Sequence, residues 1–246
     1  MDRTTPVVFL HAFPLNADMW RGQVEALRGR TTLAPHFPGF GGRPTGAADL
    51  EAFARVVLAD MDAAGIPRAV VVGLSMGGYV AFRLHAQAPE RVAGLVLADT
   101  RAGADDDAGR AKREAQAERA RHAGVGWLAD TMLPGLLGET TRRERPRVVE
   151  AVSSLIDRAD PEGVARALEA MRERPDSTPR LAEIRVPVLA LVGEEDTLTP
   201  VVESRKIAEG VPDGRLVILP GVGHLANLEA PDAFNEELRG FLNRRA

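Results

Sequence analysis

The chain has 246 residues, 45% of them hydrophobic and 27% charged, which are values typical of one globular domain with room for an insertion. Its 31 basic and 35 acidic residues give a formal charge of −4 and form no basic stripe with interleaved aromatic residues, so we expect no nucleic-acid partner. Cysteine is absent, which excludes disulfides, thiolate catalysis and cysteine-bound metal.

The start of the chain lacks the basic region, apolar stretch and small-residue cleavage site of a signal peptide. No later segment reaches the roughly 18 consecutive apolar residues that a membrane-spanning helix needs. We therefore expect a soluble, cytoplasmic protein with no membrane partner.

Short β-branched or leucine-rich segments recur along the chain and have the length of buried strands. These segments are residues 7–10, 31–34, 69–73, 94–98, 188–192 and 215–219. Helix-like segments lie between them, at residues 18–27, 50–64, 76–88 and 231–243. The alternation predicts an α/β fold with a mostly parallel sheet.

Residues 101–180 interrupt this alternation, because they contain charged amphipathic segments and no convincing strand. Prolines at 175, 179 and 187 then mark the return to the sheet, since proline is disfavoured inside helices and central strands. We expect residues 101–180 to form a helical cap inserted into a core made of residues 1–100 and 181–246.

The strongest motif is Gly73-Leu74-Ser75-Met76-Gly77, which stands between a buried strand and an amphipathic helix. It matches G-x-S-x-G in the strand-turn-helix context where a serine nucleophile sits on a sharp, strained turn. A helix-capping serine in a glycine-rich turn is the alternative. A phosphate-binding loop is not supported, because the lysine of that motif is missing.

A serine nucleophile needs a base, and in this kind of fold the chain order is nucleophile, acid, histidine. His224 follows the last predicted strand in a glycine-flanked loop, where catalytic residues of open α/β sheets lie. Glu194, Glu195 and Asp196 follow the preceding strand and are the candidate acids. Adjacent carboxylates in a turn point in different directions and no histidine is near in sequence, so we expect no metal.

Five segments, in this order, resemble those of small α/β-hydrolases of the esterase, enol-lactonase and cofactor-free haloperoxidase group. They are VVFLHAFPLNADMW, PHFPGFGGRP, VVVGLSMGGYVAF, LVGEEDTLTP and LPGVGHLANLEAP. The resemblance covers nearly the whole sheet and implies Asp196 as the acid, through a G-x-x-D-x-x-x-P pattern. That family usually has an N-terminal β-hairpin, whereas only six residues precede Val7, so we expect about six strands, all parallel.

The resemblance also implies an oxyanion hole made by the backbone N–H groups of Phe13 and Met76. Ala12 departs from the family pattern, which has glycine there, and this departure bears on the backbone angles of the loop. His11 is expected to stabilise the loop by hydrogen bonds rather than to act as a catalyst.

Together these residues predict a serine hydrolase that cleaves small carboxylic esters or lactones through an acyl-enzyme on Ser75, with no cofactor. Trp127, Met132 and Leu136 in the cap are candidate substrate-pocket residues. One alternative is perhydrolysis at the same site, which the Phe13-Pro14 pair suggests by resemblance. The other is a ligand receptor that carries the triad but turns over slowly. Oligomeric state and acyl-chain length stay open.

Overall fold

Six parallel strands form the centre of the protein in a computed structural model that describes residues 5–243. The strands are β1 (Val7–Leu10), β2 (Thr32–Leu33), β3 (Ala69–Leu74), β4 (Val92–Ala98), β5 (Val188–Gly193) and β6 (Gly214–Leu219). Their order in the sheet is β2-β1-β3-β4-β5-β6, and every neighbouring pair is parallel. The predicted α/β class, strand number and strand direction are confirmed.

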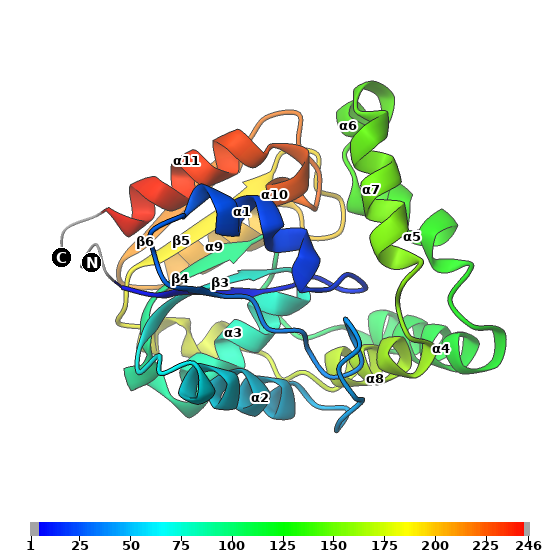
Figure 1. The fold of residues 1–246 in the computed structure, drawn as a ribbon, viewed down its shortest axis with the longest axis horizontal. Coiled ribbons are helices and arrows are strands. Elements are labelled where there is room, and N and C mark those ends of the chain that lie inside the picture. The colour runs from blue at the N-terminus through cyan, green and yellow to red at the C-terminus, as the bar shows by residue number, and fades with distance from the viewer. Residues whose placement is uncertain (1–4, 244–246) are drawn as a thin grey trace.

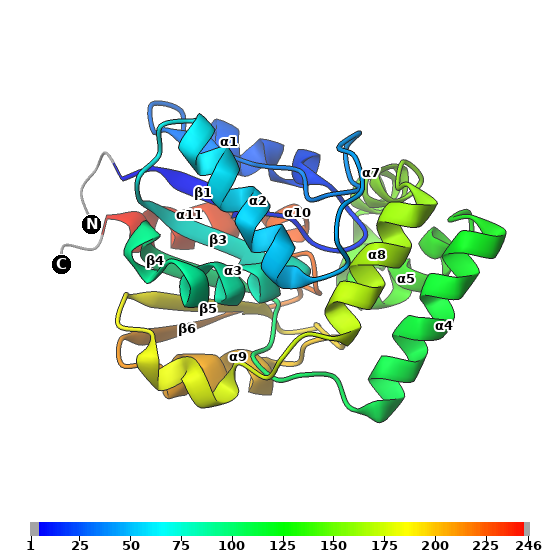
Figure 2. The same ribbon diagram turned by 90° about the horizontal axis from the view of Figure 1, so that it is seen from below.

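Helices cover both faces of this sheet. On one face lie α1 (Arg21–Ala26) and α11 (Pro231–Leu242), and on the other lie α2 (Leu50–Ala63) and α3 (Met76–Gln87) (Figures 1 and 2). Helix α9 (Val201–Gly210) packs against β5 and β6, and the short α10 (Ala226–Glu229) precedes α11. Strands β1, β3 and β5 are buried along their whole length, which explains why they read as continuous apolar runs in the sequence.

Five helices are inserted between β4 and β5 and lie beyond the carboxyl ends of the strands (Figure 1). These inserted helices are α4 (Asp107–Ala123), α5 (Leu128–Leu136), α6 (Glu139–Glu144), α7 (Pro146–Ile156) and α8 (Pro161–Arg172). Helices α6 and α7 are separate, because the helical conformation is interrupted at Arg145. Pro146 causes the break, because proline has no N–H to continue α6 but suits the first turn of α7.

Within residues 5–243, no helix combines the length and the apolar content that a membrane span needs.

The amino end of α3 lies so close to the sheet that two positions, Gly73 and Gly77, have no room for a side chain. A Cβ atom on Gly77 would lie 2.0 Å from the carbonyl oxygen of Leu10 at the end of β1. A Cβ atom on Gly73 would lie 2.4 Å from the carbonyl oxygen of Gly77 itself. The two glycines that flank Ser75 are therefore required for the contact between β1, β3 and α3.

Replacing Gly77 with alanine should lower the free energy of unfolding by about 1–3 kcal/mol, because the added methyl group overpacks against backbone that cannot move aside. Chemical denaturation measures this change. Gly22→Ala is the control, since a Cβ atom there meets nothing within 4 Å and lies in helix α1. The control should leave the protein equally stable or more stable by up to about 1 kcal/mol. Equal losses in the two variants would contradict the packing argument.

Candidate active site

The carboxyl ends of the strands place the polar residues of the site along one edge of the sheet. His11 and Phe13 follow β1, Ser75 follows β3, and Asp99 follows β4. Asp196 follows β5, and His224 lies in the loop between β6 and α10. Parallel strands end at a common edge, so residues far apart in the sequence meet there.

Ser75 occupies a backbone conformation that L-residues rarely adopt, with φ 54° and ψ −114°. Two neighbours from the end of β4 hold it in place. The Ser75 N–H donates to the carbonyl oxygen of Ala98 at 3.0 Å, and the Thr100 hydroxyl donates to the carbonyl oxygen of Ser75 at 2.8 Å. Strain of this kind persists only where the surrounding structure enforces it, and it is typical of a nucleophile turn.

His224 and Asp196 form a buried pair, with 2.8 Å between His224 Nδ1 and Asp196 Oδ2. The Asp196 carboxylate also accepts the backbone N–H groups of Leu198 (2.8 Å) and Thr199 (3.0 Å) and the Thr199 hydroxyl (2.6 Å). Burial by itself would raise the pKa of Asp196, but His224 and these donors outweigh it and hold the pKa below its usual value. Asp196 is therefore the ionised partner of the histidine.

Asp99 is a second buried carboxyl beside Asp196, and its environment has the opposite effect. Its oxygens accept the backbone N–H groups of Gly193 (2.8 Å) and Ala226 (3.3 Å), and its φ is 44°. Complete burial and the nearby Asp196 charge raise the pKa of Asp99 well above its usual range. The pKa values of the two carboxyls are thus shifted in opposite directions. Asp99 also ties β4 to β5 and to the start of α10.

Two other carboxylates near the site connect the inserted helices to the loops that carry Asp196 and His224. Glu195 accepts the Thr140 N–H (2.9 Å) and the Thr140 hydroxyl (2.5 Å). Glu229 is buried and accepts three backbone N–H groups, from Gly138 (2.9 Å), Gly223 (3.0 Å) and Leu225 (3.0 Å). Gly138 belongs to the link between α5 and α6, whereas Gly223 and Leu225 flank His224. The chain around His224 is therefore held by the same carboxylate that holds the inserted helices.

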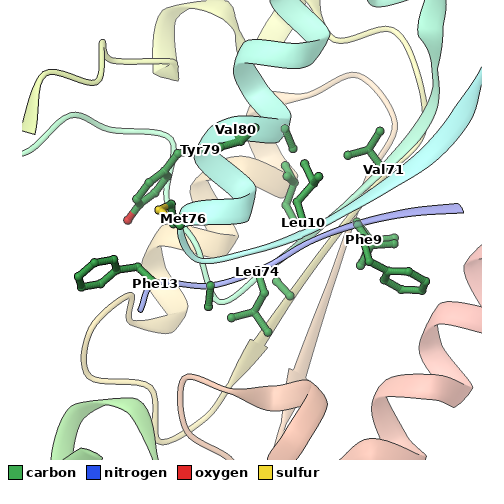
Figure 3. Packing of buried hydrophobic residues seen from close by; sticks show 14 of the residues in the cluster. Phe9, Leu10, Phe13, Val71, Leu74, Met76, Tyr79 and Val80 are labelled. Carbon is green, nitrogen blue, oxygen red and sulfur yellow. The ribbon is translucent and has the colours of Figure 1, made fainter. Parts of the chain in front are cut away.

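The two backbone amides predicted for the oxyanion hole belong to the segment after β1 and to the first residue of α3. Phe13 lies beyond the end of β1, and Met76 begins α3; Figure 3 shows them near one another with Tyr79. Within residues 5–243, neither amide N–H donates a hydrogen bond to another protein group. Ala12, the departure from the family pattern, fits the loop without a left-handed conformation, because Ser75 and Asp99 are the only non-glycine residues with positive φ in the described chain.

His11 connects this loop to the loop after β2. Its Nε2 accepts the Phe37 N–H at 3.0 Å, and its Nδ1 lies 3.0 Å from the carbonyl oxygen of Ala12. Burial lowers the pKa of His11 to about 3, so the ring is neutral at neutral pH. These contacts match the predicted role of a hydrogen bonder that stabilises the loop.

A cavity of about 350 Å³ lies between the strand ends and the inserted helices, and both Ser75 and His224 line it. Met132 and Leu136 of α5 also line it, as predicted from the sequence. Trp127 does not: its indole N–H donates to the carbonyl oxygen of Gly124 (2.8 Å), and the Arg119 guanidinium lies 4.2 Å from its ring centroid. Among residues 5–243, no three histidine or acidic side chains are grouped so that they could hold a metal ion.

Sequence reasoning missed Asp99 and Glu229. Asp99 could have been found, because it is an acidic residue directly after a buried strand, as Asp196 nearly is. Glu229 carries no comparable signal, since a glutamate near the start of a helix is ordinarily exposed to solvent.

Comparison with known proteins agrees with this geometry. The profile of the alpha/beta hydrolase fold family matches residues 5–231, and the chain therefore belongs to that family. The predicted resemblance is confirmed at this level.

Similar proteins of known name align over nearly the whole chain. A thermophilic esterase from Thermogutta terrifontis, solved with malate bound, is 39% identical with a TM-score of 0.94, over 97% of this chain and 89% of that one. The enol-lactonase from Burkholderia xenovorans LB400 is 28% identical with a TM-score of 0.90, over 98% and 92%. 3-oxoadipate enol-lactonase 2 of Acinetobacter baylyi is 27% identical over 242 residues, 97% of this chain and 88% of the relative.

Glu229→Gln should destabilise the protein by about 1–3 kcal/mol, because the new NH₂ group must face at least one backbone N–H and leaves it without an acceptor. Displacement of the His224 loop should also slow the reaction of Ser75 with a fluorophosphonate. Denaturation and labelling rates measure the two effects.

Glu195→Gln is the matched control for that variant. A glutamine there can accept the Thr140 N–H and donate to the Thr140 hydroxyl oxygen, so stability and labelling rate should change little. If the two glutamine variants behave alike, Glu229 does not position the histidine loop.

Proposed function

We propose that this protein is a serine hydrolase that cleaves small carboxylic esters or lactones through an acyl-enzyme on Ser75. One observation supports the proposal most directly. Ser75 and His224 line a single cavity, and Asp196 Oδ2 lies 2.8 Å from His224 Nδ1. A nucleophile, a base and an acid that orients the base are the parts that acyl transfer requires.

In the proposed reaction the Ser75 hydroxyl attacks the substrate carbonyl carbon while His224 Nε2 accepts the hydroxyl proton. The proton on Nδ1 is directed at Asp196, which leaves Nε2 free as the acceptor. The carbonyl oxygen becomes an oxyanion, and the unused amides of Phe13 and Met76 are available to stabilise it. Met76 is the first residue of α3, so the positive end of the helix dipole favours the same charge.

His224 then donates its proton to the leaving alkoxide, and the alcohol departs while the acyl group stays on Ser75. Water, deprotonated by His224, attacks this acyl-enzyme and releases a carboxylic acid with Ser75 restored. With a lactone, the alcohol and the acid remain in one molecule. The ionised state of Asp196 stabilises the imidazolium that forms in both steps.

The choice of esters and lactones as substrates is supported by the similar proteins. One of them is an esterase and two are enol-lactonases, and each aligns with more than nine-tenths of this chain. The cavity is at the small end of the range for ligand pockets, which favours compact substrates.

A panel of short- and long-chain aryl esters and small lactones, with and without hydrogen peroxide, tests the proposal. Multiple turnovers with water are expected, together with stoichiometric fluorophosphonate labelling of Ser75. Ser75→Ala should abolish both. Labelling that survives this substitution would refute the assignment of the nucleophile. A single turnover per protein would favour a receptor, and dependence on peroxide would favour perhydrolysis.

Asp196→Asn should reduce kcat by up to about 10⁴-fold while the fold is kept, the scale expected when the acid no longer fixes the tautomer and charge of the histidine. Glu194→Gln is the control, because Glu194 is exposed and the one hydrogen bond that its carboxylate forms within residues 5–243 is from the Gly221 N–H, at 3.3 Å. A comparable loss in the Glu194 variant would show that the acid is misassigned.

Met132→Ala should change the relative kcat/KM across acyl-chain lengths by about 1–3 kcal/mol of discrimination, because Met132 lines the cavity. Trp127→Ala should leave the chain-length profile unaltered, since Trp127 packs outside the cavity. Steady-state kinetics with a homologous series of aryl esters measures both profiles. An altered profile in Trp127→Ala with an unaltered profile in Met132→Ala would show that α5 presents a different face to the substrate.

A further inference from the structure

One part of the cavity wall carries an unbalanced positive charge. Three guanidinium groups, from Arg101, Arg113 and Arg174, all contact the single carboxylate of Asp105. The Asp105 side chain is only 2% exposed, and its arginine partners hold its pKa below the usual range. One negative charge is thus shared by three positive charges, two of which, on Arg101 and Arg113, belong to residues that line the cavity.

The remaining charged residues of this wall do not remove the excess. Lys112 lines the same cavity, is exposed, and forms no ion pair within residues 5–243. Asp106 lines it too, but its carboxylate accepts the Gly109 N–H at the start of α4 (2.8 Å). Glu203 lies within electrostatic range of Arg101 but pairs with Lys206 at 2.6 Å. The cavity wall and the arginine behind it therefore hold four positive groups against two negative ones.

Arg101 is the member of this cluster nearest in sequence to the nucleophile. Strand β4 ends at Ala98, three residues before Arg101. Thr100, the residue directly before Arg101, donates its hydroxyl to the carbonyl oxygen of Ser75. Arg101 Nε is shut off from solvent and has no hydrogen-bond partner within the described chain. The Arg101 guanidinium also interacts with Tyr79, and the Arg101 side chain stays 31% exposed where it lines the cavity. Positive charge on this part of the wall exceeds negative charge, and Arg101 and Lys112 are accessible to an anion that enters the cavity.

Another part of the cavity wall is apolar. It is formed by Met132 and Leu136 of α5 together with Leu198. A substrate that fits both walls has an apolar part and an anionic end. A guanidinium fork matches the planar geometry of a carboxylate and binds it through parallel hydrogen bonds.

Building on the serine hydrolase function proposed above, we propose that the substrate is an ester or lactone that carries a free carboxylate. Arg101 binds this carboxylate, with Arg113 and Lys112 beside it, while the scissile carbonyl lies against Ser75. The chemistry at the carbonyl is unchanged; the carboxylate serves for recognition and stays on the product. The cavity volume of about 350 Å³ restricts the substrate to a short chain between carboxylate and carbonyl.

Matched ester pairs test this inference. On the acyl side, 4-nitrophenyl hemiglutarate is compared with 4-nitrophenyl valerate, and on the alcohol side 3-acetoxybenzoate is compared with phenyl acetate. The wild-type protein should prefer the carboxylate-bearing member of at least one pair in kcat/KM, and salt should weaken the preference. Arg101→Gln should lower that preference ratio by about 10- to 100-fold, chiefly through KM, the effect expected for loss of a charged hydrogen bond.

Arg110→Gln is the control, because Arg110 lies on α4 with Lys112 and Arg113 but pairs with Glu173 outside the cavity. It should leave the preference ratio unaltered. A wild-type protein that prefers the neutral member of both pairs, or an unchanged ratio in Arg101→Gln, would overturn the inference. The serine hydrolase proposal would survive that result as long as Ser75 is labelled and the neutral esters turn over.

Glutarate binding gives a readout that needs no catalysis. Glutarate should raise the melting temperature of the wild-type protein and compete with ester substrates, whereas its neutral dimethyl ester should not raise the melting temperature. Lys112→Gln, an exposed substitution that should not disturb folding, should weaken glutarate binding. If the protein binds inorganic phosphate but not glutarate, the site recognises another anion and the carboxylate assignment is wrong. If glutarate binds but Ser75 is unreactive, only the hydrolase proposal fails.

Discussion

The close contact between the amino end of α3 and the ends of β1 and β3 is the constraint on which the site depends. Without side chains at Gly73 and Gly77, backbone meets backbone, and the turn between them forces Ser75 to a positive φ. The same contact leaves the amide of Met76 unused at the positive end of the helix. One packing arrangement thus sets the position of Ser75. It also leaves the Met76 N–H without a hydrogen bond to another group within residues 5–243.

Around this turn, the protein controls charge by distributing hydrogen-bond donors unevenly between two neighbouring carboxyls. Asp196 receives two backbone amides, a hydroxyl and the histidine, and it stays ionised. Asp99 is fully buried beside that charge and has two backbone donors, and its pKa rises. The charge on Asp196 is one of the causes that raise the pKa of Asp99, whereas His224 and the donors around Asp196 lower the pKa of Asp196.

The inserted helices shape the cavity, and carboxylates connect them to the loops that perform the proposed chemistry. Glu229 links Gly138 to the residues on either side of His224, and Glu195 links Thr140 to the loop of Asp196. The cavity therefore has one wall set by the apolar face of α5 and another set by the arginines around Asp105. The residues proposed for substrate recognition therefore line the same cavity as Ser75 and His224 but are different from the residues proposed for catalysis.

The sequence by itself determined the α/β class, the six parallel strands and the positions of Ser75 and His224, because strand periodicity and the G-x-S-x-G turn are local properties of the chain. Only tertiary structure decided which acid faces the histidine. Glu194, Glu195 and Asp196 are adjacent in sequence, and the short side chain of Asp196, held by the amides of its own turn, is the one directed at His224. Tertiary structure likewise decided that Met132 lines the cavity and Trp127 does not. It also brought three arginines to Asp105 and buried Glu229. Each of these depends on contacts between residues distant in the chain.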